Sequence, residues 1–282
     1  MKRPLHLGAA VDTRDFRQHL RELIRSRPSG LRPLTLPRPE RRSLSEVIDG
    51  AVSVTPQGEF FVWEKSLSEA HSDGGEFTDR VLSRLGRAGE RAHEHPAFGT
   101  LAEIPPERIA WIDLETTGLH GRPLFLIGMM QWNGRDLVLR QTFARDYSEE
   151  RAVLAHFLES AKNIDALVSF NGKCFDWPFL RDRLVYHRLR GEPSVEHVDL
   201  LHLSRRRWRG TLPDCRLQTL ERYLCGRVRR GDIPSHEIPQ RYHDFVHRRD
   251  PRLVAPIFHH NRLDLLTMAE LLVALVDGDR AG

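Results

Sequence analysis

The stretch IAWIDLETTGL, residues 109–119, decides what kind of fold the chain can build. Its first four residues are apolar and predict a buried strand, yet Asp113 and Glu115 follow directly. Side chains alternate between the two faces of a strand, so these acids share one face. Neighbouring carboxylates repel each other, and such a pair is tolerated in solvent or used where a divalent cation binds. Gly118 then permits a sharp turn out of the strand.

The residues after this strand predict the rest of the sheet. Two further strand-like runs, 124–132 and 137–143, follow 109–117 after short turns and predict an antiparallel meander. Ser148 is expected to cap an amphipathic helix. A strand, a helix and another strand come next, at 166–170, from about Pro178 and at 197–203. This order predicts an α/β fold in which helices pack on both faces of a mixed sheet.

Length and composition indicate one large domain with an extension. The chain has 282 residues, 40% hydrophobic and 29% charged, which is ordinary for a protein with a substantial core. The net charge of +4 arises from 43 Lys and Arg against 39 Asp and Glu. If several acids gather in one site, the remaining surface is more basic than this total, which suits a polyanionic partner.

Cysteine usage and hydropathy bear on the compartment. Cys174, Cys215 and Cys225 show no C-x-x-C spacing, so neither a disulfide framework nor a zinc ribbon is indicated. Cys174 is expected to be a small core residue. No apolar stretch reaches about 18 residues, and the first residues lack the apolar core of a secretory signal. We expect a cytoplasmic chain with no membrane segment.

The chain divides into three expected parts. Residues 1–43 contain an amphipathic helix at 14–25 and a flexible tether rich in Pro and Arg. Residues 44–106 form a small extension with a hairpin at 51–65 and a short helix near 77–88. The main domain is expected at 107–278.

Two further acidic signals accompany the opening pair. In SFNGKCFDWPFL, residues 169–180, Asp176 lies where a strand gives way to a helix. In FHHNRLDLL, residues 258–266, His260 and Asp264 are four positions apart and share one helix face. Each acid alone is commonly a solvated charge or a cap. The joint occurrence of all three signals favours a common site.

These motifs resemble those of the DEDD-type 3′-to-5′ exonucleases of the ribonuclease-H-like superfamily, most closely the YprB-like branch. The resemblance covers about 107–278 and includes NGKCFDWPFL, HVDLLHLSRRRWR, GDIPSHEIP and HNRLDLL. It implies a ribonuclease-H-like mixed sheet. The stretch 44–106 matches more loosely.

The resemblance also implies a metal site with two Mg²⁺ or Mn²⁺ ions. Asp113, Glu115 and Asp264 would bind one ion, Asp113 would bridge to the second, and Asp176 would reach that second ion through water. General chemistry agrees, because two cations clamp both ends of an in-line phosphodiester displacement. Hard carboxylate oxygens select such ions, whereas zinc prefers His and Cys.

The catalytic base is expected to be one of two adjacent histidines. Exonucleases of this superfamily place either His five residues or Tyr four residues before the last Asp, and this sequence has His at both positions. On a continuous helix His260 lies roughly 40° from Asp264, whereas His259 lies roughly 140° away. Geometry therefore favours His260, with both histidines as surface or capping groups as the alternative.

Several residues near the acids are candidates for substrate contact. Thr116 and Thr117 resemble positions that contact the terminal nucleotide, or they are turn residues. Asn171 either binds a phosphate or sugar or caps the turn, and Lys173 meets either a phosphate or solvent. Asp199 is expected either to support a metal ligand without binding the ion or to be a structural acid, because four carboxylates already complete the metal set.

A basic run follows the last predicted strand. Arg205, Arg206, Arg207 and Arg209 surround Trp208, which combines phosphate-binding charge with a ring able to stack on an unpaired base. The alternative is a solvated basic face.

The leading hypothesis is a metal-dependent 3′-to-5′ exonuclease acting on single-stranded DNA or on DNA ends in repair. The alternatives are a nucleic-acid-binding module, an endonuclease of the ribonuclease H type and an RNA-processing nuclease. Nucleic acid is the expected partner, DNA in preference to RNA, and a helicase or another repair protein is considered as a second. Groups that recognise a 2′-hydroxyl cannot be placed from the sequence.

Overall fold

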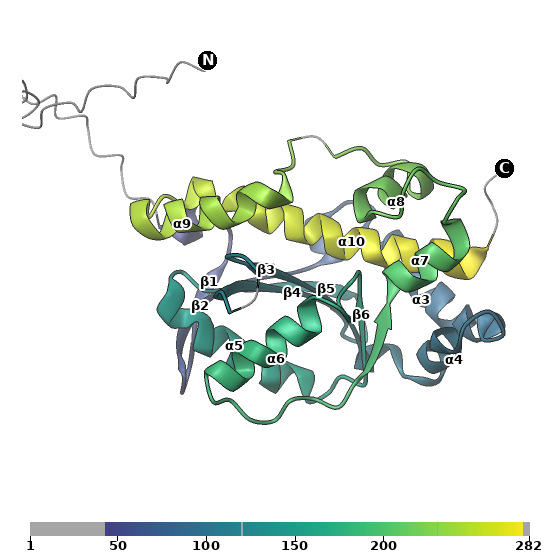
Figure 1. Ribbon diagram of the computed structural model, residues 1–282, viewed down its shortest axis with the longest axis horizontal. Helices are drawn as coiled ribbons and strands as arrows, with labels where there is room; N and C mark the ends of the chain where they lie inside the picture. Colours follow the sequence, from purple (N-terminus) through teal and green to yellow (C-terminus); the bar gives the residue numbers. More distant parts are fainter. Residues whose placement is uncertain (1–42, 120, 230, 279–282) are drawn as a thin grey trace, which may run out of the picture. The chain divides into compact units, whose positions relative to one another are not determined.

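The computed structural model of the protein describes residues 43–119, 121–229 and 231–278. The helix expected at 14–25 and the tether after it lie outside the described residues. A seven-stranded sheet forms the centre of the described chain, and helices cover both of its faces (Figure 1). This arrangement confirms the mixed α/β fold that the sequence predicts.

The sheet has the strand order β1-β2-β5-β4-β3-β6-β7. The strands are β1 (Ala51–Thr55), β2 (Gly58–Ser66), β3 (Ile109–Thr116), β4 (Leu124–Trp132), β5 (Leu137–Phe143), β6 (Ala166–Ser169) and β7 (Glu196–Asp199). Short turns join β3, β4 and β5, so these strands pair antiparallel. The pairs β3–β6 and β6–β7 are parallel, because a helix separates the two strands of each crossover.

Within the described residues, three α-helices follow β2, one follows each of β5 and β6, and four follow β7. The α-helices are α2 (Leu67–Ala70), α3 (Gly74–Arg87), α4 (Pro96–Glu103), α5 (Glu150–Ala161), α6 (Asp176–Tyr186), α7 (Leu200–Trp208), α8 (Leu217–Leu224), α9 (Ile238–Arg248) and α10 (Ala255–Asp277). Short 3₁₀ turns are η1 (Leu44–Glu46), η2 (Ala88–Arg91), η3 (Pro106–Arg108), η4 (Tyr147–Glu149), η5 (Ser235–Glu237) and η6 (Pro251–Leu253).

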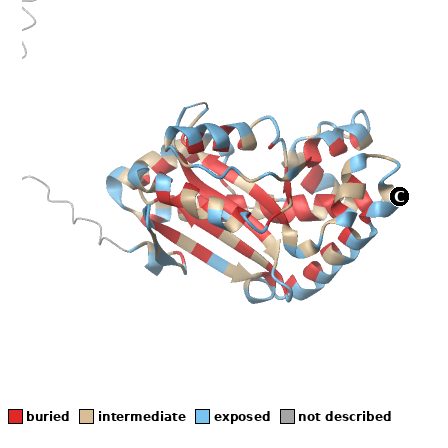
Figure 2. Cartoon of the chain, turned by 90° about the horizontal axis from the view of Figure 1, so that it is seen from below, coloured by how far each residue is buried: buried red, intermediate tan, exposed pale blue. Residues whose placement is uncertain are grey.

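The long helix α10 runs across one face of the sheet, and α5 and α6 cover the other (Figure 1). The strands between these layers are the most buried part of the molecule, as the red segments of Figure 2 show. Trp111, Phe125 and Phe143 are fully buried there. Burying an aromatic or aliphatic side chain of this size contributes roughly 1.5–3 kcal/mol, so this core holds α10 firmly against β3 and β4.

The hairpin expected at 51–65 forms β1 and β2, and it continues the main sheet. Strand β2 pairs with β5 from Phe61 opposite Phe143 to Ser66 opposite Val138. Helix α3 packs against α10. The described residues from 43 to 278 belong to one compact unit. The extension is therefore part of the framework that positions α10.

Two predicted element boundaries are wrong. Ser148 does not cap α5: it lies in η4, which Asp146 caps by accepting the Ser148 N–H at 3.0 Å, and α5 follows with no side-chain cap. The strand expected at 197–203 ends at Asp199, whose carboxylate accepts the Leu201 N–H at 3.0 Å and begins α7. A short apolar run is compatible with either a strand or a buried helix, and here the cap decides for the helix.

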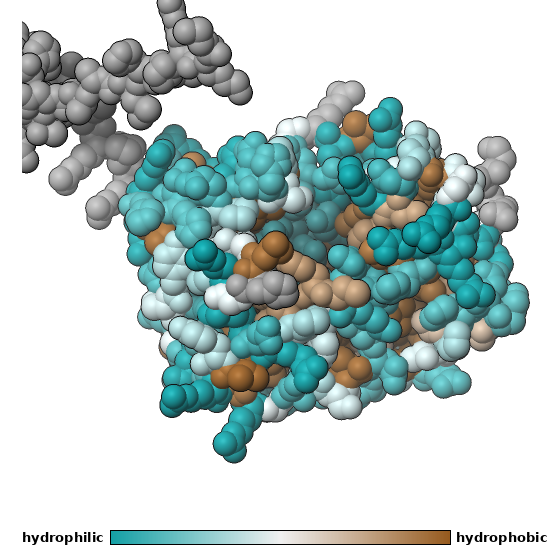
Figure 3. Space-filling model, in the orientation of Figure 1, coloured by the Kyte–Doolittle hydropathy of each residue, from teal (hydrophilic) through white to brown (hydrophobic). Residues whose placement is uncertain are grey.

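The surface of the described chain is mostly polar. Figure 3 shows one face on which hydrophilic residues predominate and apolar residues form small separate areas. No helix in the described ranges is long and apolar enough to cross a membrane. Cys174, expected in the core, is exposed in the loop after β6, which corrects that prediction.

Candidate functional site

The site is built around the end of β3. Asp113 is half-buried and Glu115 is buried, and both lie on the face of β3 that α10 covers. Strand β6 pairs with β3 only as far as Trp111. Beyond that point the backbone of β3 does not pair with β6. The carboxylate of Asp176 makes a hydrogen bond with the backbone of Leu114 instead. Asp176 therefore reaches the strand between the two acids.

Asp176 and Asp264 come from two helices on opposite sides of the sheet. Asp176 is the first residue of α6, and Asp264 lies midway along α10. Burial, followed by the charges of Asp264, Glu115 and Asp176, raises the pKa of Asp113 well above its usual value. Such mutual influence requires close spacing, because charge interactions fall off with distance. The structure thus brings together the four carboxylates that the sequence singled out.

Glu115, Asp176 and Asp264 show the same electrostatic signature, with burial as the largest cause of each raised pKa. Burial first, and then the charges of Asp264 and Asp176, raises the pKa of Glu115 well above its usual value. Burial, with the charges of Asp199 and Asp264, raises the pKa of Asp176 to about 7. Pairs of carboxylates with raised pKa values are typical of sites that bind cations or transfer protons.

His260 lies inside this group, whereas His259 is exposed. The Nε2 atom of His260 is 3.5 Å from Asp264 Oδ2. Its Nδ1 atom is 2.9 Å from both carboxylate oxygens of Asp232. Asp232 accepts the Nδ1–H of the imidazole, so Nε2 is the ring nitrogen that faces Asp264. Helix α10 is continuous here and turns His260 toward Asp264, as helical spacing predicts, while the role of His260 as the base stays a prediction.

A buried arginine binds the other oxygen of Asp264. The guanidinium of Arg229 donates to Asp264 Oδ1 at 2.6 Å, to Glu221 Oε2 at 2.5 Å and to Asp232 Oδ2 at 3.1 Å. Its side chain is only 6% exposed, and that of Glu221 is 1% exposed. Arg229 therefore joins the loop before η5, helix α8 and helix α10 through one planar group.

Sequence reasoning missed the residues that support the acids. Asp232 and Ser235 lie in GDIPSHEIP, a stretch for which the sequence offered no physical account, and both face His260. Arg229 precedes that stretch, and Asn261 sits beside His260 on α10. No local pattern identifies these partners, because their contacts join distant parts of the chain.

The predicted substrate-contact residues flank the acids. The Thr116 hydroxyl donates to Gly118 O at 2.9 Å, and the Thr117 hydroxyl donates to Pro123 O at 3.2 Å, so both stabilise the turn after β3. Asn171 is exposed and left-handed, with φ of 65°. The carboxylate of Asp199 accepts the Asn171 N–H at 2.8 Å.

Asp199 also accepts the backbone N–H of Lys173 at 3.1 Å. It thus fixes the whole turn after β6, which agrees with a structural role for this acid. Lys173 itself is exposed. The contacts of Thr116, Thr117, Asn171 and Lys173 with a substrate stay predictions.

The basic run of α7 splits into exposed and buried residues. Arg205 and Arg206 are exposed, and Arg207 pairs with Glu94 at 3.3 Å. Trp208 is 7% exposed and packs in the core, so the expectation that it stacks on a base is wrong. The helical period turns this ring inward toward α10, away from the arginines before it.

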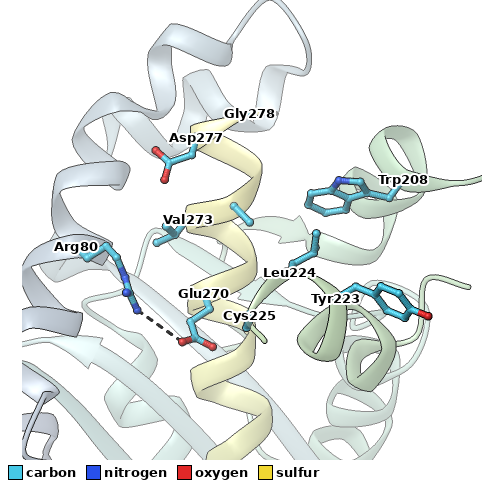
Figure 4. Close-up of a pocket in the computed structure, with 10 residues that line it drawn as sticks. Arg80, Trp208, Tyr223, Leu224, Cys225, Glu270, Val273, Asp277 and Gly278 are labelled. Carbon is cyan, nitrogen blue, oxygen red and sulfur yellow. Dashed lines mark ion pairs between the residues drawn. The ribbon is translucent and has the colours of Figure 1, made fainter. Parts of the chain in front are cut away.

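Two cavities border the helices of this region. One of about 560 Å³ is lined by α8 and the loop that carries Arg229 and Asp232, directly behind the acids. Another of about 380 Å³ lies at the far end of α10, between α3, α7 and α8 (Figure 4). Arg80 and Glu270, two of its lining residues, form an ion pair at 3.6 Å. Its lining does not include the four acids.

The donor set fits a hard divalent cation in type and charge. Within residues 43–119, 121–229 and 231–278, no three Asp, Glu, His or Cys side chains form a ready-made coordination group. Oxygens of Asp264 and Asp113 instead bind Arg229 and Asn261. Carboxylate oxygens are the ligands that Mg²⁺ and Mn²⁺ prefer, and a cation would offset both the burial and the repulsion that raise these pKa values.

Comparison with known proteins gives matches over the same part of the chain. A family model of the ribonuclease H superfamily matches residues 110–276. The chain is 34% identical over 168 residues to the protein YprB of Bacillus subtilis (strain 168), covering 58% of this chain and 40% of YprB. It is 28% identical over 174 residues to the protein MJ0365 of Methanocaldococcus jannaschii, covering 60% of this chain and 95% of that protein. The match thus spans two fifths of the length of YprB.

Among solved structures, the family B DNA polymerase from the hyperthermophilic archaeon Pyrobaculum calidifontis aligns with a TM-score of 0.47 and 19% identity. That alignment covers 59% of this chain and 24% of the polymerase. The family model covers more than half of the chain, including β3, β6 and α10, which frame the acids. The chain therefore belongs to the ribonuclease H superfamily and is similar to YprB over this domain.

Proposed function

We propose that the protein is a metal-dependent 3′-to-5′ exonuclease that hydrolyses phosphodiester bonds of nucleic acid. The observation that carries this proposal is the convergence of four carboxylates at the end of β3 with His260 among them. This combination supplies both the charge that binds divalent cations and a group that accepts a proton. Single-stranded DNA or DNA ends in repair are the proposed substrates.

Each acid has a proposed role in holding two Mg²⁺ or Mn²⁺ ions. Asp113, Glu115 and Asp264 would hold one ion, and Asp113 and Asp176 the other. The ions would supply an activated water and stabilise the leaving oxygen. Arg229 orients Asp264, and Asp232 orients His260, so both groups keep one position relative to the strand. The Nε2 atom of His260 would accept the proton of the attacking water.

Replacing the two adjacent histidines tests the proposed base. His260→Ala is expected to lower turnover at least ~10²-fold while oligonucleotide binding remains, because a positioned proton acceptor is removed. His259→Ala, which changes an exposed neighbour on the same helix, is expected to stay within a few-fold of the parent. Single-turnover hydrolysis of a labelled oligonucleotide measures both, and the reverse ranking would contradict the assignment.

The exposed arginines of α7 are proposed to contact phosphates. Burial first, and then the charges of Arg206 and Lys173, lowers the pKa of His95, which places these two cations on the same surface. Arg205→Ala with Arg206→Ala is expected to reduce the slope of log affinity against log salt. The reduction should be about 0.7 for each phosphate of a single strand that the variant no longer binds.

Filter binding or fluorescence anisotropy across a salt series measures this slope. The matched control is Arg188→Ala with Arg190→Ala, which removes two exposed arginines beyond α6. An unchanged slope in the α7 variant would show that its arginines form only a solvated face.

One assay tests the proposed activity as a whole. Oligonucleotides of DNA and of RNA, labelled at the 5′ or the 3′ end, are incubated with the protein and Mg²⁺, Mn²⁺ or EDTA. A ladder of shortening 5′-labelled products that requires metal supports the proposal. Internal cuts would show an endonuclease, and retention without cleavage would show a binding module. The RNA and DNA arms identify the preferred nucleic acid.

A further inference from the structure

Three residues form a straight row across the centre of the sheet. Gln141 of β5 lies directly opposite Gly128 of β4, and Gly128 lies directly opposite Asp113 of β3. Residues paired in this way place their side chains on the same face of a sheet. That face is the one covered by α10, and Asn261 of α10 sits over the middle of the row.

The missing side chain of Gly128 makes room for Asn261. A Cβ atom at position 128 would lie 2.0 Å from Asn261 Oδ1 and 2.7 Å from its Nδ2 atom. Both distances are shorter than any non-bonded contact with carbon. Glycine at this position therefore lets α10 bring a polar side chain into contact with the sheet itself, where a larger residue would push the helix away.

The hydrogen bonds of the row fix the orientation of the Asn261 amide. Gln141 Nε2 donates to Asn261 Oδ1 at 2.7 Å and to the backbone oxygen of Phe258 at 2.9 Å. The Asn261 oxygen therefore faces Gln141, and its amino group must face the other way. That group donates to Asp113 Oδ2 at 2.7 Å and to the backbone oxygen of Asp113 at 3.3 Å.

Burial makes this arrangement rigid. Gln141 and Asn261 are both completely buried, so water does not compete for their hydrogen bonds. A flipped Asn261 amide would place two oxygens against each other at Asp113 and two donors against each other at Gln141. Asn261 thus holds the Asp113 carboxylate through Oδ2, and Oδ1 is the oxygen that remains for a further ligand.

We propose that Asn261, oriented by Gln141 across Gly128, is a positioning residue that presents Asp113 to a divalent cation. The inference rests on the proposed metal-dependent function and adds to it the group that holds the shared ligand in place. Groups that hydrogen-bond a metal ligand commonly affect metal affinity or activity 10- to 100-fold, and they act without touching the ion.

The test is the affinity of the full chain for Mn²⁺ in the absence of substrate. Electron paramagnetic resonance or calorimetry measures the Kd. Asn261→Ala is expected to raise the Kd for Mn²⁺ about 10- to 100-fold and to lower kcat, with little change in the KM for an oligonucleotide. Gln141→Met keeps the volume of the side chain and touches no carboxylate. It is expected to raise the Kd in the same direction, because Asn261 is then free to rotate.

Asn163→Ala is the matched control, because Asn163 is exposed in the turn after α5. It is expected to bind Mn²⁺ like the parent. If both Asn261→Ala and Gln141→Met bind Mn²⁺ with the parent Kd while Asp113→Asn does not, the positioning role is overturned and the metal site stands. If Asp113→Asn and the parent bind Mn²⁺ equally, the proposed function itself fails, and this inference fails with it.

Discussion

Asp113→Asn protein is expected to lose phosphodiester hydrolysis to the level of an enzyme-free control and, in EDTA at pH 7.5, to unfold at a higher temperature than the parent. Loss of hydrolysis follows because Asp113 is the ligand proposed for both ions. The gain in stability follows because burial, and then the charges of Asp264, Glu115 and Asp176, raises the pKa of Asp113 in the folded state. Asparagine has the same shape and still accepts the Asn261 hydrogen bond, but it cannot ionise.

The pH dependence of this gain has a definite sign. An acid whose pKa is higher in the folded than in the unfolded state stabilises the fold most below its unfolded pKa, near 3.8 for Asp. That stability is lost as the pH rises from this value to the folded pKa of Asp113, which lies well above it. The difference in Tm between variant and parent should therefore be small at pH 4 and exceed ~3 °C above pH 7.

Thermal unfolding from pH 4 to pH 8 in EDTA, with oligonucleotide hydrolysis in Mg²⁺ or Mn²⁺, measures both effects. Asp182→Asn is the matched control, because Asp182 is an exposed acid on α6 and should change neither quantity. Hydrolysis at the parental rate by the Asp113 variant would remove Asp113 from the proposed site.

Arg229→Gln is expected to lower the free energy of unfolding by about 3–5 kcal/mol, or roughly 10 °C in Tm. The guanidinium is the cation that Glu221, Asp232 and Asp264 share. Removing it leaves these three carboxylates short of one positive charge, although Arg227 still pairs with Glu221, and the cost of that exceeds the net value of the ion pair itself. The Arg229 ion pairs therefore compensate, in part, for gathering so many acids in one place.

Urea denaturation at pH 7.5 gives the free energy directly. Arg222→Gln is the control, since Arg222 is exposed on α8 next to Glu221 and its loss should cost less than ~0.5 kcal/mol. Equal destabilisation by both substitutions would mean that Arg229 acts through general surface charge. A double variant with Glu221→Gln should recover part of the loss, because Glu221 then retains Arg227 but not Arg229 as a partner, and the substitution removes its buried negative charge.

The strands were predictable because their residues alternate or form short apolar runs between turn residues. The runs around Trp111, Leu126 and Leu139 each gave a strand near its expected place. Prediction failed where one hydrogen bond decides between two structures. Asp199 starts a helix inside an apolar run, and Asp146 caps the 3₁₀ turn in which Ser148 lies.

The site was predictable only in part. Spacing places Asp113 with Glu115 and His260 with Asp264, because alternation and helical periodicity act over a few residues. The supporting residues were not predictable in this way. Asn261 and Asp113 are 148 positions apart, and Asp232 and His260 are 28 apart. Trp208 shows the opposite error. Its position among arginines predicted a surface that binds nucleic acid, but the side chain is buried in the core.

Helix α10 is the last helix of the described chain, and it carries His260, Asn261 and Asp264. During synthesis the strand that carries Asp113 and Glu115 leaves the ribosome long before this helix does. Contacts between such distant segments form late in folding, because a large loop must close first. A nascent chain, or one cut before α10, thus lacks Asp264 and has no His260 imidazole beside Asp113, Glu115 and Asp176. The proposed activity would begin only when the whole domain is folded, which spares nearby nucleic acid from incomplete molecules.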